Sequence, residues 1–198
     1  MSHVQPLENL IISFIIQEYT EVNNINESGI KVVLDERKIA FLNKYINRYQ
    51  LNEHVFINFK TGNVIIKESV PLARILKEWT INGSVMAMEP NKLNSNFFML
   101  WLCLFGQKKE KSVLINSHLP VNVKTTLQHF FYTLLNTRLI DKGDYLQVMP
   151  FSNILLFSYQ RKGTIEETSE LNYLLPDRDR KKIKSILLNW EEEHEKIY

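Results

Sequence analysis

The stretch over residues 121–162 limits the possible folds more than any other part of the chain. Its first half has apolar residues at spacings of three and four, which predicts a helix with one buried face over residues 122–140. Gly143 is expected to cap the end of this helix. Alternating apolar residues then predict two strands, at 145–149 and 154–159, joined by a turn. The stretch therefore indicates a helix that leads into a β-hairpin, as in many α+β domains.

The face of this helix opposite the apolar stripe is polar and carries no negative charge. It consists of Lys124, Thr125, Gln128, His129, Tyr132 and Asn136. Each of these side chains can hydrogen-bond to a phosphate or to the edge of a base. A helix with such a face, followed by a hairpin, has the shape of a DNA-recognition helix followed by a wing. For His129 and Tyr132 the simpler alternative is packing at the edge of the core.

Apolar periodicity and turn residues divide the remaining chain into short elements. Helices are expected at 7–21, 36–49, 71–79, 96–105, 113–119 and 166–174. A hairpin is expected at 55–67, with short strands at 32–34 and 84–88. Asp35 and Pro71 are suited to begin two of these helices, and Asn94 or Ser95 a third. The helix at 96–105 is apolar on all sides, so it is expected to be buried.

Charge is unevenly distributed, although the formal net charge is only +2. Between residues 108 and 162 there are eight basic and three acidic residues, so the rest of the chain has a net charge of −3. A basic segment in a mildly acidic chain is typical of a nucleic-acid-binding face, although solvated surfaces also show it. The basic loop Lys108, Lys109 and Lys111 precedes the polar helix, and Arg161 and Lys162 follow the expected hairpin.

Composition and hydropathy bound the class of protein. Hydrophobic residues make up 44% of the chain and charged residues 23%, as in globular proteins. The single cysteine, Cys103, excludes an intramolecular disulfide framework and fits a reducing compartment. No basic region precedes the apolar run at 10–16, and the run at 97–105 is far shorter than the roughly 20 residues that span a bilayer. A cytoplasmic protein without a membrane anchor is expected.

No residue pattern indicates an enzyme, a cofactor or a metal site. The five histidines are scattered, and neither CxxC nor HxxxH spacing occurs. No serine lies in a GxSxG setting, and the six glycines form no phosphate-binding loop. We therefore expect neither catalysis nor a bound cofactor.

From about residue 55 to 159 the chain resembles the winged helix-turn-helix effector domain of the OmpR/ToxR type, which includes the transcriptional activators related to ToxR and CadC. In that family a strand pair precedes a three-helix core, and VFINFKTGNVIIKES resembles the pair. LNSNFFMLWLCLFG resembles the first core helix and EKSVLINSHL the second. Thr125, Thr126 and Leu127 match the start of the recognition helix, and Tyr145 to Pro150 followed by FSNILLFSY resembles the wing.

This resemblance implies an α+β fold, in which a winged helix-turn-helix core follows a β-hairpin, with extra N-terminal helices and a long C-terminal helix. Residues 1–53 would be an N-terminal helical element, 54–162 the winged-helix DNA-binding domain and 163–198 a C-terminal helical segment. The implied function is a transcriptional regulator that binds double-stranded DNA through a recognition helix at about 122–140 and a wing at about 145–159.

In such a complex the start of the recognition helix enters the major groove. Base edges would be read by Lys124, Gln128 and His129. Phosphates or base edges would be contacted by Thr125, Tyr132 and Asn136. The DNA backbone would be contacted by Lys108, Lys109, Lys111, Arg161 and Lys162.

A helix is predicted for the last segment of the chain, over residues 177–198. Its apolar stripe of Ile183, Ile186, Leu187, Trp190 and Ile197 has heptad-like spacing. Basic residues near its start and acidic residues near its end oppose the helix dipole, so packing is needed to hold it. The stripe either pairs with a second copy, which would make a homodimer, or covers the chain's own core.

A non-enzymatic assembly module is the alternative function. The order strand, helix, strand, strand, helix is expected over residues 31–79, and a similar order begins at Lys111. Two units of this kind in one chain resemble the tandem N-terminal domains of secretins. The apolar helix expected at 96–105, between the two units, is not part of that pattern.

Overall fold

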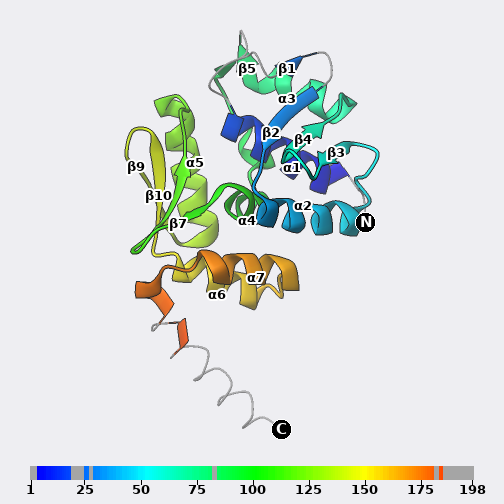
Figure 1. The fold of residues 1–198 in the computed structure, drawn as a ribbon. Helices are drawn as coiled ribbons and strands as arrows, with labels where there is room; N and C mark the ends of the chain where they lie inside the picture. Colours follow the sequence, from blue (N-terminus) through cyan, green and yellow to red (C-terminus); the bar gives the residue numbers. More distant parts are fainter. Residues whose placement is uncertain (1–3, 19–24, 27–28, 82–83, 181–182, 185–198) are drawn as a thin grey trace.

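The computed structural model describes residues 4–18, 25–26, 29–81, 84–180 and 183–184, which form an α+β fold. Two halves of the chain have the same order of elements: helix, hairpin, helix, hairpin, helix (Figure 1). The first half consists of α1 (Val4–Glu18), β1 (Ile25–Asn26), β2 (Gly29–Val33), α2 (Glu36–Tyr49), β3 (Val55–Asn58), β4 (Asn63–Ile66) and α3 (Val70–Trp79). The second half consists of α4 (Ser95–Phe105), β7 (Gln107–Lys108), β8 (Val113–Asn116), α5 (Val121–Leu135), β9 (Arg138–Asp141), β10 (Tyr145–Met149) and α6 (Ser152–Gln160).

Short elements join and extend the halves. Between them lie β5 (Thr80–Ile81), β6 (Ser84–Val85) and the 3-10 helix η2 (Pro90–Lys92). After α6 the chain forms α7 (Ile165–Leu174), which lies beside α6 in Figure 1 and packs on α6, α4 and α2. No helix within the described residues is long and apolar enough to cross a membrane.

Each half contains one antiparallel sheet, and the two sheets have the same strand order. The first is ordered β1-β2-β4-β3 and the second β7-β8-β10-β9. In each sheet a helix connects two strands that run in the same direction but are not neighbours: β2 and β3 in the first, β8 and β9 in the second. The next strand, β4 or β10, lies between these two and is antiparallel to both. This is a split βαβ arrangement. The order strand, helix, strand, strand, helix expected for both halves is thus confirmed.

Helices α1 and α4 pack against each other and form the centre of the molecule (Figure 1). Every residue of α4 from Phe97 to Phe105 is buried, as its apolar sequence predicts. In α1 the run from Leu7 to Ile16 is also fully buried. The two helices are the first elements of their halves, so the halves share one hydrophobic core rather than each having its own.

Several predicted elements are confirmed. Helix α2 has the expected bounds, and the Asp35 side chain caps it by accepting a hydrogen bond from the Lys38 backbone N–H at 2.9 Å. Asn94 caps α4 in the same way, through the backbone N–H of Phe97. The hairpin of β3 and β4 and the helix α3 also lie where the sequence predicts them.

Two short segments of the second half were predicted wrongly. The helix expected at 113–119 is strand β8, in which Val113 and Ile115 point inward and pair with β10. The strand expected at 154–159 is the helix α6, since its buried residues Ile154, Leu155 and Ser158 follow helical spacing. The peptide before Pro150, between β10 and α6, is cis.

The helix expected over 122–140 ends earlier than predicted. Helix α5 stops at Leu135, and Asn136 caps it in the left-handed conformation, with φ of 47°. Gly143 instead forms the turn of the hairpin between β9 and β10, with φ of 87°. The wing expected at 145–159 therefore does not form: its first strand, β10, pairs with β9 and β8, and its second is helical. A helix-turn-helix is also absent from these segments, because a strand precedes α5.

The expected domain boundary at residues 53–54 lies inside the first sheet, because β2 pairs with β4. Residues 1–53 are thus not an element of their own. Of the C-terminal helix expected at 177–198, only 177–180 and 183–184 are described, and Ile186, Leu187, Trp190 and Ile197 lie outside the described residues. Ile183 is buried in the chain's own core. Asp179 is buried as well and accepts hydrogen bonds from the backbone N–H groups of Phe151 and Ser152.

Candidate functional site

The side chains of each sheet form an inner row that faces the helices and an outer row that faces outward. In the second sheet the inner residues Val113, Val148 and Leu139 pair with one another and are buried. The neighbouring outer row, Leu114, Gln147 and Ile140, is only half-buried. We call the outer rows of the second sheet, together with the turns of its two hairpins, the hairpin face.

Basic side chains lie at both ends of the hairpin face. Lys109 and Lys111 are exposed in the turn between β7 and β8, and Arg138 is exposed at the start of β9. These three lie at the same end of the sheet, since Val113 pairs with Val148 and Met149 with Arg138. Lys142 is exposed in the turn at the opposite end. Within the described residues none of these four side chains forms an ion pair.

The hairpin face also carries hydrogen-bonding and aromatic groups. Tyr145 is 36% exposed and lies beside Asn116 in the ladder between β8 and β10. Gln147 donates a hydrogen bond to the Ser112 hydroxyl at 3.0 Å, which orients its amide at the centre of the face. An amide and a phenol beside exposed cations are groups that nucleic-acid-binding surfaces use.

Basic residues are concentrated on the strands and hairpin turns of both sheets. In residues 29–34, 55–68, 107–116 and 138–149 there are eight basic side chains and four acidic ones, whereas the chain as a whole has 24 and 22. The remainder of the chain is therefore slightly acidic. This positive charge points to the sheets, rather than to a helix, as the electrostatic footprint for a polyanion.

The predicted recognition helix contributes an exposed stripe, but the stripe is uncharged. Thr125, His129, Tyr132 and Asn136 are all exposed along α5, and Gln128 is half-buried beside them. The Thr125 hydroxyl donates to the Val121 carbonyl at 2.9 Å, and the His129 ring packs edge-on against Phe130. The structure thus brings these residues together on one face of α5 without a cation among them.

Lys124, the one lysine or arginine of α5, has a structural role. Its side chain is only 8% exposed, and Nζ lies 3.0 Å from Asp141 Oδ1 and 2.5 Å from the Gly143 carbonyl oxygen. The hydrogen bond from Lys124 lowers the pKa of the Asp141 carboxyl, and the Gly143 N–H adds to this effect. The pair fastens α5 to the hairpin of β9 and β10, so Lys124 is not available to read a base.

Some of the other basic residues predicted to contact DNA also form ion pairs, whereas the rest are exposed. Lys108 Nζ lies 2.8 Å from Asp177 Oδ1, and this hydrogen bond lowers the pKa of the Asp177 carboxyl. Arg161 follows α6, outside the hairpin face, where it pairs with Glu167 and donates to Asn96. Lys162 is exposed in the turn after α6. Of the residues predicted to contact the DNA backbone, Lys109 and Lys111 are the ones on the hairpin face with free side chains among the described residues.

Sequence reasoning missed Arg138, Lys142, Tyr145 and Gln147 as members of one surface. The signal was present in the alternation Arg-Leu-Ile-Asp and Tyr-Leu-Gln-Val-Met, in which the apolar residues mark the inner row. It was hidden because the first of these segments was read as the end of a helix. Among the described residues no cluster of His, Cys, Asp and Glu has the arrangement of a metal site.

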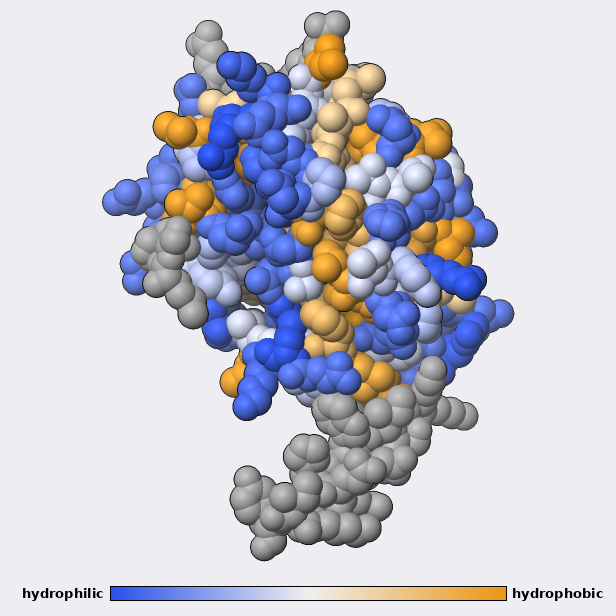
Figure 2. Space-filling model, turned by 180° about the vertical axis from the view of Figure 1, so that it is seen from behind, coloured by the Kyte–Doolittle hydropathy of each residue, from blue (hydrophilic) through white to orange (hydrophobic). Residues whose placement is uncertain are grey.

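Apolar side chains reach the surface on other parts of the molecule. Figure 2 shows a face on which hydrophobic residues form a band from top to bottom, beside a broad hydrophilic area. On the outer row of the first sheet Val33 is 66% and Phe56 51% exposed.

No protein-family model matches the chain, and no curated protein or solved structure matches it either.

Proposed function

We propose that this protein binds double-stranded DNA through the hairpin face. The observation that carries the proposal is the set of exposed cations, Lys109, Lys111, Arg138 and Lys142, around the half-buried outer row of an antiparallel sheet. Pairs of antiparallel strands fit the major groove of DNA as well as a helix does, and several DNA-binding proteins insert strands there. Lysines and arginines at the ends of the strands would contact the phosphates on either side.

The duplicated topology supports this proposal. DNA-binding proteins commonly bind with two similar units, each of which contacts one of two neighbouring half-sites of the duplex. Here both units are in the same chain. In the first sheet Lys31 lies on β2, Lys60 in the turn between β3 and β4, and Lys67 directly after β4. A single chain of this architecture would therefore contact DNA with both sheets, without the homodimer that the sequence suggested.

The α5 stripe is the weaker candidate for the DNA contact. Phosphate contacts supply most of the affinity of a protein for DNA, and they require cations. Lys124 is buried in its pair with Asp141, so α5 offers hydrogen-bonding groups alone. We infer that α5 mainly supports the hairpin of β9 and β10, against which it packs.

The test is binding of a mixed-sequence duplex of about 30 base pairs, followed by fluorescence anisotropy between roughly 50 and 200 mM salt. Wild-type binding should weaken steeply with salt. In Lys109→Ala/Lys111→Ala the slope of log affinity against log salt should fall by about two, because each phosphate contact contributes about one unit. The matched control is Lys77→Ala/Lys184→Ala, which removes two exposed lysines outside the sheets and should leave the slope unchanged.

An equal loss of slope in the two double variants would mean that only net charge matters, and would contradict the proposed surface. Absence of duplex binding by the wild-type protein at the lowest salt would contradict the function itself.

An assembly module remains the second candidate, and two observations favour it. Both halves have the order strand, helix, strand, strand, helix on which this alternative was based. The outer row of the first sheet, Lys31, Ile65 and Phe56, is mainly apolar, and Val33 beside it is exposed. Exposed apolar rows of this kind are common in protein interfaces. Light scattering across a concentration series distinguishes this candidate, since it requires an oligomer that Phe56→Ser dissociates.

A further inference from the structure

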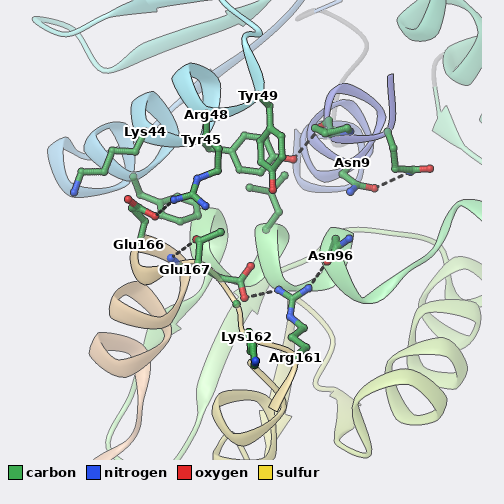
Figure 3. Close-up of a pocket in the computed structure, with 16 residues that line it drawn as sticks. Asn9, Lys44, Tyr45, Arg48, Tyr49, Asn96, Arg161, Lys162, Glu166 and Glu167 are labelled. Carbon is green, nitrogen blue, oxygen red and sulfur yellow. Dashed lines mark hydrogen bonds and ion pairs between the residues drawn. The ribbon is translucent and has the colours of Figure 1, made fainter. Parts of the chain in front are cut away.

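A cavity of about 560 Å³ lies between the two halves, on the side of α2 and α7 (Figure 3). Gln5 and Asn9 of α1 and Tyr45 and Arg48 of α2 line it from the first half. Asn96 of α4 and the turn between α6 and α7 line it from the second. Its volume is within the range of about 300–1,000 Å³ that is usual for small-molecule sites.

The charges around the cavity do not balance. Four cations line it, Lys44, Arg48, Arg161 and Lys162, against the two carboxylates of Glu166 and Glu167. Both carboxylates are already paired: Arg48 lies 2.7 Å from Glu166, and Arg161 pairs with Glu167. Lys44 and Lys162 are exposed and form no ion pair within the described part of the chain. The cavity therefore has a net positive charge and favours an anion.

The Arg161 side chain lines this cavity and keeps hydrogen-bond donors that have no partner among the described residues. The Arg161 guanidinium donates through Nη1 to Asn96 and through Nη2 to Glu167, but its Nε–H is buried and unbonded. These two hydrogen bonds use two of the five N–H donors of Arg161, whose side chain lines the cavity and is partly exposed. In Figure 3 this guanidinium points from the α6–α7 turn toward α4, between Glu167 and Asn96.

The opposite wall of the cavity is aromatic. Phe41, Tyr45 and Tyr49 line it from α2, and the two tyrosine rings lie 4.7 Å apart at an angle of 58°. The Tyr45 hydroxyl donates to the Pro6 carbonyl at 3.0 Å, which fixes its ring. Burial raises the pKa of Tyr45, so the phenol is neutral and adds no negative charge to the wall. Rings in this arrangement offer a flat ligand a surface on which to pack.

We propose that this cavity binds a small organic anion with an aromatic ring, its acidic group at Arg161 and Lys162 and its ring against Tyr45 and Tyr49. Guanidinium and ammonium groups recognise phosphates and carboxylates by charge-assisted hydrogen bonds. The ligand would contact both halves of the molecule at once. Its binding does not depend on the DNA contact, since the cavity and the hairpin face share no residue.

The test is isothermal titration calorimetry with two probes, adenosine 5′-monophosphate and 4-hydroxybenzoate, each up to about 5 mM. At least one should bind, and Arg161→Gln should weaken it about tenfold or more. Adenosine, which lacks the phosphate, should bind about tenfold more weakly than its monophosphate. Because Arg161 also pairs with Glu167, Lys162→Ala provides a variant at an exposed position that should weaken binding without affecting the fold.

The control variant is Lys77→Ala, an exposed lysine of α3 that does not line the cavity. Binding that is unchanged in both Arg161→Gln and Lys162→Ala would overturn the site. Equal binding of adenosine and its monophosphate would overturn the anionic character of the ligand. Absence of binding by both probes would overturn the proposal, and DNA binding can be measured on the same samples to keep the two proposals separate.

Discussion

In the first sheet the outer row consists of Lys31, Ile65 and Phe56, and at the same register in the second sheet it consists of Leu114, Gln147 and Ile140. The inner rows of the two sheets are much more alike. Ile30, Ile66 and Val55 in the first correspond to Val113, Val148 and Leu139 in the second, and all six are buried. The inner rows need apolar residues because they face the shared core, whereas the outer rows are free to take on different partners.

An ion pair in the second half, between the buried Lys124 of α5 and Asp141 of β9, departs from this rule. In α2 the buried residues Ile39, Leu42 and Ile46 have the spacing of Lys124, Leu127 and Phe131 in α5. Lys124 thus holds the place of Ile39, and its partner Asp141 holds the register of Ile57. An apolar pair of positions in one half has become an ion pair in the other, and the fold is kept.

The largest effect is expected from breaking the core that the halves share. Trp101 of α4 is fully buried, so Trp101→Ala should lower the free energy of unfolding by about 3–5 kcal/mol. Because α4 packs on α1, both halves should unfold in one urea transition, followed by far-UV circular dichroism and by hydrogen exchange in α2. Tyr132→Ala, at a 56% exposed position, is the control and should change stability by less than about 0.5 kcal/mol. Two transitions, with the first half at its wild-type midpoint, would show that the halves fold separately.

A smaller effect is expected from the ion pair that distinguishes the halves. Lys124→Ile leaves the Asp141 carboxylate and the Gly143 carbonyl without their donor and should cost about 1–3 kcal/mol. The double variant Lys124→Ile/Asp141→Ile, which copies the first half, should recover most of this loss. Urea denaturation of the wild type and the three variants completes a double-mutant cycle. Additive losses in the cycle would mean that the two residues do not act as a pair.

Helix starts give a third contrast between the halves. Asp35 caps α2 with its side chain, whereas α5 starts at Pro120 without a side-chain cap. Asp35→Ala should therefore cost about 1 kcal/mol, and Asp35→Ser, which keeps an acceptor, should cost little. Thermal unfolding of both variants measures the difference, and an equal loss in the two would rule out capping as its cause.

The smallest effect concerns the pH dependence of the second half. The pKa of Asp141 is lowered in the folded protein, chiefly by Lys124, so the unfolded chain binds the proton more readily. The resulting stability is present above the ordinary pKa of 3.8 and is lost as the pH falls through the lower folded value. Relative to Lys124→Ile/Asp141→Ile, the wild type should thus lose stability below about pH 4. A constant difference between them from pH 7 to about pH 2 would contradict this linkage.

How far the sequence predicted this structure depended on the length and capping of each segment. Helix α2 and helix α4 were predicted almost to the residue, since each is long, strongly patterned and begins at a capping side chain. Residues 113–116 and 154–159 are short apolar runs, for which periodicity does not separate helix from strand. Residues 113–116 form a strand because they pair with β10, and residues 154–159 form a helix that packs against the core. Both depend on tertiary contacts, which a local sequence pattern does not contain.

The candidate site was harder to predict than the fold. Lysines on an amphipathic helix are normally exposed, so the sequence favoured Lys124 as a base reader. Its burial depends on Asp141, which the β9–β10 hairpin brings back to α5. The outer rows became recognisable as one surface only when the register of the strands was known, because a shift of one residue exchanges the two faces.

The most direct measurement of the central claim is the change in backbone amide NMR signals when a DNA duplex is added. Contact through the hairpin face predicts that the signals of residues 107–116 and 138–149 move, with smaller changes in the strands of the first sheet. The exposed stripe of α5 and helix α7 should move little. Changes confined to Thr125, His129, Tyr132 and their neighbours would instead support the recognition helix and would contradict a contact made by the sheets.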